Sequence, residues 1–241
     1  MMPPESLKLR LLEVASRHPV PTRTRRRLPT AGVIALAAGA TLATYGALLG
    51  LGALWTGGGV TGAARAVSSG MAVVLRLGTA TTGRPAESGA WIVAGTLALA
   101  FAATVLAVPS RRSMLSPPRG QLLAVAIGVP LVVGAWLVLW GTTYVDPFVR
   151  VGWRCLALTA GTAPWPFLAL YRASRRLDPQ HPRLTGAALG SAAGAWGAVM
   201  AVSWCPLTVG DHVLVGHVLP LVLLSGVGAC IGYRMFRLRR V

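Results

Sequence analysis

The sequence predicts an all-α integral membrane protein with six transmembrane helices and both termini in the cytoplasm. Three observations predict this class. The 241-residue chain has 54% hydrophobic residues and a mean hydropathy of +0.62. Its apolar residues gather in six segments, each close to the ~20 residues that a helix needs to cross ~30 Å of hydrocarbon. Its basic residues are concentrated in alternate connecting segments.

The segments divide the chain into a cytoplasmic leader, residues 1–30, and one transmembrane domain, residues 31–241. The first span follows a cluster of arginines, the second a loop rich in Gly, Ser and Thr, and the third a tight link at Pro117 and Pro118. The fourth is the shortest, and its Pro164-Trp165-Pro166 should kink or break the helix. The expected spans are residues 31–55, 89–108, 121–140, 155–171, 184–204 and 213–233.

Glycines four residues apart in the fifth and sixth spans predict close helix packing, because this spacing lets helix backbones approach each other in lipid. They are Gly186, Gly190 and Gly194 in the fifth span and Gly228 and Gly232 in the sixth.

The loop charges orient the chain. Eighteen of the 23 Lys and Arg residues lie in residues 1–30, 110–120, 172–183 and 234–241, and five lie in the remaining connections. The positive-inside rule places the basic segments in the cytoplasm, as a multi-pass protein of a bacterial inner (cytoplasmic) membrane with both ends inside. The same bias and anionic lipid headgroups account for the net charge of +17, so the expected partner is the lipid bilayer and not nucleic acid.

The distribution of ionisable residues argues against an enzyme and against proton-coupled transport. All six acids lie in the leader or in loops, and His217 is the clear ionisable group within an apolar span. Intramembrane acids and bases normally mark proton and ion pathways. The chain has no zinc-protease, serine-hydrolase, P-loop or dinucleotide-binding motif. We therefore expect no enzymatic activity and no cofactor.

The leader contains one apolar stripe. Leu7, Leu11, Val14 and Ala15 follow the spacing of one helix face, which predicts a short helix over residues 7–17. A helix this short is marginal alone in water. It must bury the stripe against the membrane surface, the protein's own loops or a partner.

Two of the three cysteines are expected at the outer face of the membrane, where disulfides can form and persist. Cys155 begins the fourth span and Cys205 follows the fifth. Two interpretations stay open for them: a disulfide or redox- or metal-responsive pair, and simple packing. Cys205, Asp211, His212 and His217 are weak candidates for a metal site, because their spacing matches no strong metal signature.

Residues 153–240 resemble the NrsF-type (CarR-like) multi-pass membrane anti-sigma factor family. The resemblance rests on Trp153-Arg154-Cys155, the proline-containing fourth span, the basic loop 172–183, the Gly- and Ala-rich fifth span ending at Cys205-Pro206, and Gly216-His217-Val218-Leu219-Pro220 in a last span that ends in arginines. The resemblance in architecture, six spans with both ends inside, covers the whole chain.

The resemblance implies a negative regulator that sequesters an extracytoplasmic-function sigma factor and releases it on an envelope, redox, metal or light stress signal. It places the family's two signal-linked cysteines on Cys155 and Cys205, and Trp204 stands where many relatives have a His before the second cysteine. Sigma-factor binding would then fall to the leader helix through its apolar stripe and flanking arginines, as in helix-in-groove recognition; these residues are Leu7, Arg10, Leu11, Val14 and Arg17. The alternative functions are a small membrane transport or channel subunit and a membrane scaffold protein.

Overall fold

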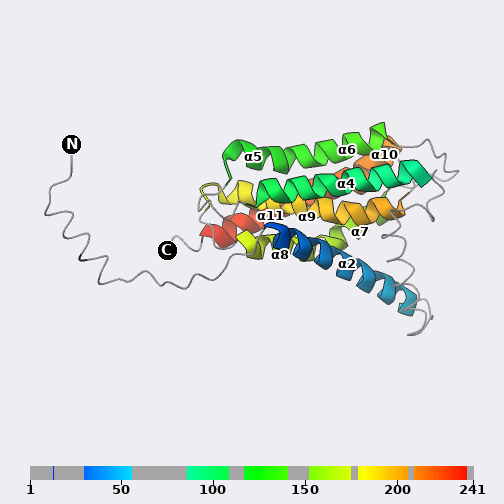
Figure 1. Cartoon of the computed structure of the whole chain (residues 1–241), viewed down its shortest axis with the longest axis horizontal. Coiled ribbons are helices and arrows are strands. Elements are labelled where there is room, and N and C mark those ends of the chain that lie inside the picture. The colour runs from blue at the N-terminus through cyan, green and yellow to red at the C-terminus, as the bar shows by residue number, and fades with distance from the viewer. Residues whose placement is uncertain are drawn as a thin grey trace.

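The computed structural model describes residue 13 and residues 30–55, 86–108, 117–140, 152–174, 179–205 and 209–237. All regular structure in these ranges is helical. The elements are α2 (Thr30–Trp55), α4 (Ala86–Ala107), α5 (Arg119–Leu123), the π-helix η1 (Ala124–Gly128), α6 (Val129–Leu139), α7 (Trp153–Thr162), α8 (Pro164–Ser174), α9 (Pro182–Trp204), α10 (Gly210–Val213), the π-helix η2 (Leu214–Val218) and α11 (Leu219–Arg237). They form an elongated bundle (Figure 1).

The helices follow the predicted spans closely. The first, second and fifth spans are single helices, α2, α4 and α9, whereas the third is α5–η1–α6 and the sixth is α10–η2–α11. Four of these helical stretches are long and apolar enough to cross a membrane: Thr30–Ala47, Arg119–Leu139, Pro182–Trp204 and Gly210–Phe236. A shorter apolar helix covers Trp91–Ala107. The count of six spans and the cytoplasmic termini stay predictions.

The fourth predicted span is divided where the prolines predict a break. α7 ends at Thr162 and α8 begins at Pro164, so the two halves have 10 and 11 residues. Proline lacks the backbone N–H and its ring crowds the preceding turn, which interrupts a helix. Neither half alone has the length of a membrane span.

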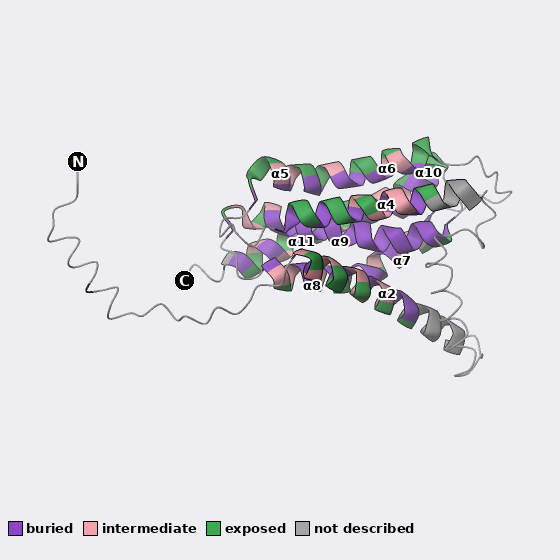
Figure 2. Ribbon diagram, in the orientation of Figure 1, coloured by how far each residue is buried: buried purple, intermediate pink, exposed green. Residues whose placement is uncertain are grey.

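α9 is the centre of the bundle. Every side chain from Thr185 to Ser203 is buried, and Figure 2 shows the helix buried along its length. α11 and α4 pack most extensively against it, and α7, α8 and η1 also contact it. Its composition of Gly, Ala and Ser suits this position, because small residues let several helices approach one axis.

The glycines of α9 and α11 let the backbones of these two helices pack directly against each other. A Cβ added to Gly186 would lie 2.1 Å from the carbonyl oxygen of Gly228, and one added to Gly190 would lie 2.1 Å from that of Leu224. A Cβ on Gly232 would lie 2.6 Å from the carbonyl oxygen of Pro182. The glycine spacing predicts close helix packing, and the structure shows that it occurs between α9 and α11.

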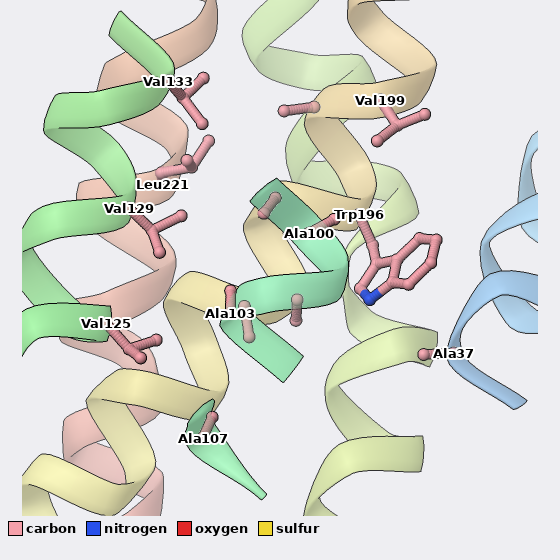
Figure 3. Packing of buried hydrophobic residues seen from close by; sticks show 14 of the residues in the cluster. Ala37, Ala100, Ala103, Ala107, Val125, Val129, Val133, Trp196, Val199 and Leu221 are labelled. Carbon is pink, nitrogen blue, oxygen red and sulfur yellow. The ribbon is translucent and has the colours of Figure 1, made fainter. Parts of the chain in front are cut away.

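One tryptophan ties α9 to its neighbours. Figure 3 shows Trp196 projecting from α9 between Ala100 of α4 and Ala37 of α2. Its Nε1 donates a hydrogen bond to Thr104 Oγ1 at 3.0 Å, and this hydroxyl donates to the Ala100 carbonyl at 2.9 Å. Trp196 is thus a buried aromatic side chain whose polar group is satisfied.

The exterior of the bundle is apolar. Large hydrophobic side chains on the outer helix faces are exposed, among them Trp91, Ile127, Leu131, Leu214 and Val227. In water such a surface would favour association, whereas in a bilayer it faces lipid tails. The apolar helices and this surface are those of a membrane protein.

The two π-helices share a cause. Each ends two residues before a proline: η1 before Pro130 and η2 before Pro220. In an α-helix the proline ring would clash with the carbonyl four residues earlier, at Ala126 and Gly216. The wider π turn relieves that clash, and such single-turn bulges are frequent at functional sites.

Candidate functional site

Two cysteines and two histidines form a cluster at one end of the bundle. The cluster consists of Cys155, Cys205, His212 and His217, and the candidate ligand atoms of these four side chains all lie within 4.8 Å of one another. It is carried by the start of α7, the end of α9, and α10. These elements meet at the end of the bundle away from the C-terminal end of α11 (Figure 1).

Three separate parts of the chain supply the ligands. Cys155 lies in the first turn of α7, and Cys205 directly follows α9, where its backbone N–H still bonds to the Ala201 carbonyl. His212 lies in α10 and His217 in η2. The cluster therefore forms only when the ends of α7, α9 and the last helical segment come together.

The π-helix brings the two histidines onto one face. They are five positions apart, which in an α-helix of 3.6 residues per turn would separate them by about 140° around the axis. The wider turn of η2, with its i→i+5 bonding, brings residues five apart into near alignment. The two imidazole rings accordingly lie with centroids 5.6 Å apart.

A pair of glycines brings Cys155 to the histidines. Gly152 has φ +56°, and a Cβ there would lie 2.8 Å from the backbone nitrogen of Gly216. A Cβ on Gly216 would in turn lie 3.1 Å from Cβ of Cys155. The start of α7 thus packs directly against η2. Side chains at positions 152 and 216 would prevent this close approach.

The polar atoms of the cluster are in contact. Sγ of Cys205 lies 3.0 Å from Nε2 of His212, and Sγ of Cys155 lies 3.5 Å from the same nitrogen. A hydrogen bond from the Cys155 thiol, with others from His212 and His217, holds the pKa of the Cys205 thiol below its ordinary value although burial opposes this. A thiolate is the nucleophilic and metal-binding form of cysteine.

His217 is the deepest member of the cluster. It is 1% exposed, and among the described residues its Nδ1 has no hydrogen-bond partner. Buried polar atoms are nearly always paired, so this nitrogen is an exception that calls for an explanation. The predicted candidate Asp211 is exposed and lies outside the cluster. The third cysteine, Cys230, is exposed on α11.

The arrangement supports two kinds of chemistry. Cys155 and Cys205 are not joined by a disulfide, and bringing two thiols together is the first requirement for forming a reversible one. Two sulfur and two imidazole ligands are also a donor set for a tetrahedral metal ion. The structure brings Cys155 and Cys205 together, and the choice between a responsive pair and simple packing stays a prediction.

The cluster also connects to α2. The ring of Trp204, next to Cys205, packs edge-on against Tyr45 of α2 with centroids 6.5 Å apart. Tyr45 is fully buried. α2 begins at Thr30, so one aromatic contact and one helix connect the cluster with the point where the leader joins the bundle in sequence. The leader residues predicted to bind a sigma factor, Leu7, Arg10, Leu11, Val14 and Arg17, lie outside the described residues.

Comparison with known proteins identifies the family. The family model described as NrsF, negative regulator of sigma F, matches residues 51–238. The chain is a helical membrane protein with a regulatory role. It belongs to this family of negative regulators of a sigma factor. This is a regulatory family and not an enzyme family. No curated protein and no solved structure matches the chain.

Proposed function

We propose that this protein sequesters an extracytoplasmic-function sigma factor at the bacterial inner membrane through its leader, and releases it when the Cys155–Cys205 region receives a stress signal. The family match carries the proposal, because a negative regulator of a sigma factor needs a sigma factor as its partner. The conformational part of the proposal comes from the cluster and its contact with α2.

The leader is the proposed sigma-binding segment. Its stripe of Leu7, Leu11 and Val14 would lie in an apolar groove of the sigma factor, with Arg10 and Arg17 facing acidic side chains. The family model begins at residue 51, so the leader lies outside the matched region. Variation in this segment would let related regulators hold different sigma factors.

The proposed signal path runs from the cluster to the leader through α2. A change in the bonding of Cys205 shifts the neighbouring Trp204, which packs on Tyr45. Tyr45 lies 15 residues after Thr30, about 22 Å along the helix at 1.5 Å per residue. Two arrangements of this contact, differing in how far the leader is exposed, would bias sigma-factor binding.

The first test is a pull-down of the detergent-solubilised full-length protein from its own cells, with and without residues 1–27. We expect the full-length protein to retain a sigma factor and the truncated protein to lose it. Absence of any sigma factor from both samples, under unstressed conditions, would refute sequestration. Retention by the truncated protein would move the binding surface away from the leader.

A pair of leader variants tests the helix face. Leu11→Glu places a charge within the stripe, whereas Leu12→Glu places the same charge about 100° further around the helix. We expect only Leu11→Glu to release the sigma factor. Equal binding by both variants would show that the stripe is not the docking surface.

A double variant, Cys155→Ser with Cys205→Ser, tests the signal. We expect it to hold the sigma factor in unstressed cells but to lose the transcriptional response to redox or metal stress. An unchanged response would remove these cysteines from the mechanism, without affecting the sequestration that the pull-down tests.

A further inference from the structure

We propose that Cys155, Cys205, His212 and His217 form a tetrahedral binding site for a single d10 transition-metal ion, Zn²⁺ or Cu⁺. The site would be closed, with all four ligands from the protein. The proposal goes beyond sigma-factor regulation, and it stands on the geometry and burial of the four side chains.

The donor set selects the class of ion. Two thiolates and two imidazoles are soft to intermediate ligands, which favour Zn²⁺ and Cu⁺ over Mg²⁺ or Ca²⁺, and tetrahedral S₂N₂ coordination is typical of zinc. Asp211, the hard oxygen ligand nearby in sequence, is exposed and outside the cluster. Its exclusion fits an ion that prefers sulfur and nitrogen.

The distances match the size of such a site. Zn–S bonds of about 2.3 Å and Zn–N bonds of about 2.0–2.1 Å at tetrahedral angles place sulfur and nitrogen about 3.5 Å apart. The two Sγ–Nε2 distances to His212 are 3.5 Å for Cys155 and 3.0 Å for Cys205. The largest separation in the cluster, within 4.8 Å, needs only small side-chain rotations to close around one ion.

Burial supplies the second, independent observation. His212 is 6% exposed, Cys205 6% and His217 1%. Nδ1 of His217 is buried without a hydrogen-bond partner among the described residues. Leaving a buried polar atom unpaired is unfavourable, and an ion bound at this nitrogen would remove that cost. Four protein ligands in a buried setting are also the pattern of a structural or sensory site, since catalytic zinc keeps an open position.

The backbone is shaped to hold these ligands. η2 places His217 beside His212, and the contact of Gly152 with Gly216 places Cys155 beside both. Three separate deviations, a π-helix, a positive φ and a glycine–glycine contact, converge on the four ligands. A bound ion would then join α7, α9 and the last helical segment at one point.

The test measures ion binding by the purified full-length protein in detergent, under anaerobic and reducing conditions. Zn²⁺ alone and Cu⁺ alone are titrated separately, with competing chelators, and metal content is measured after dialysis. We expect one ion per chain. Loss of a supporting group around a metal site already costs about 10- to 100-fold in affinity, so Cys205→Ser and His217→Gln should each cost at least as much.

The chain provides matched controls. Cys230→Ser and His181→Gln replace a cysteine and a histidine outside the cluster, and both should bind the ion as the unaltered protein does. Co²⁺ serves as a spectroscopic probe: the unaltered protein should show thiolate-to-cobalt charge-transfer bands with tetrahedral ligand-field bands. Cys155→Ser should weaken the charge-transfer bands, and His212→Gln should alter the ligand-field bands.

Either of two results would overturn the proposal: no tight binding of Zn²⁺ or Cu⁺ by the unaltered protein, or undiminished binding by both His212→Gln and His217→Gln. Gel filtration in detergent and the helical circular-dichroism signal identify any variant that fails to fold, and the remaining ligand variants then decide. Because no sigma factor is present, this result is separate from the pull-down that tests sequestration.

Discussion

His212 and His217 face one another with ring centroids 5.6 Å apart, although five residues separate them in one helical segment. The π turn between them makes this possible, and Pro220 accounts for the turn because its ring cannot lie against the carbonyl of Gly216 in a regular α-helix. A proline outside the cluster thus determines which face of the helix carries His217.

Replacing Pro220 should therefore weaken ion binding. In Pro220→Ala the segment is free to return to α-helical hydrogen bonding. The hydrogen-bond register then changes by one residue, which turns His217 by about 100° around the helix axis. We expect at least a tenfold loss of ion affinity in titrations of the purified protein, with no loss of helical content. Pro130→Ala, which removes the proline after η1, should leave the affinity unchanged. If Pro220→Ala and Pro130→Ala bind the ion with equal affinity, the π turn at η2 is not needed to form the ion site.

Gly152→Ala should disturb the same cluster from α7. The positive φ costs a residue with a side chain about 1–2 kcal/mol, and the new Cβ would lie 2.8 Å from the backbone of Gly216. We expect a lower thermal unfolding temperature and faster alkylation of Cys155. Gly210→Ala is the control, because a Cβ there meets no atom within 4 Å. Similar unfolding temperatures and alkylation rates for the two variants would contradict this account.

Gly190→Ala should destabilise the centre of the bundle. Its Cβ would lie 2.1 Å from the carbonyl oxygen of Leu224, so α9 and α11 must separate, at a cost of about 1–3 kcal/mol for overpacking. Gly226→Ala adds the same methyl group on α11 where it meets no atom within 4 Å, and should leave stability unchanged or slightly higher. Thermal unfolding in detergent distinguishes them, and a destabilisation common to both would point to a general effect of glycine loss.

Trp204→Leu should prevent a signal at the cysteine–histidine cluster from inducing sigma-dependent transcription. It removes the ring that packs on Tyr45 while retaining Cys205 and the other ligands. We expect unchanged ion affinity but loss of induction in a sigma-dependent reporter strain. Trp153→Leu, at an exposed tryptophan on α7 near the same end, is the matched control and should retain induction. Normal induction in Trp204→Leu would exclude this contact from the path.

The apolar lengths, the prolines of the fourth span and the glycine spacing predict much of the fold, because each acts locally or along one helix. α2 and α9 begin within two residues of the predicted starts, the break falls at Ala163, and Gly186 meets Gly228. The two π-helices were not predicted, since a proline within an apolar run is compatible with a kink, a break or a bulge.

The site was predicted only in pieces. The predicted topology places Cys155 and Cys205 at the same face, and the sequence groups Cys205, Asp211, His212 and His217 as candidates for one metal site. Their union depends on the Gly152–Gly216 contact between distant segments, and on a π turn that overrides α-helical spacing. With regular geometry the two histidines point apart, so spacing alone argued against the site. Pro220 and the glycine at position 216 are the sequence signals that the structure explains.

The complete burial of α9 has a consequence for how the protein is made. Among the four candidate spans α9 has the lowest mean hydropathy, 1.3, and none of its central side chains is available to face lipid. A segment of this kind partitions poorly from the translocon by itself. We expect α9 to enter the bilayer as a hairpin with α11, and a nascent chain stalled after Trp204 to stay beside the insertion machinery until its partner helix emerges.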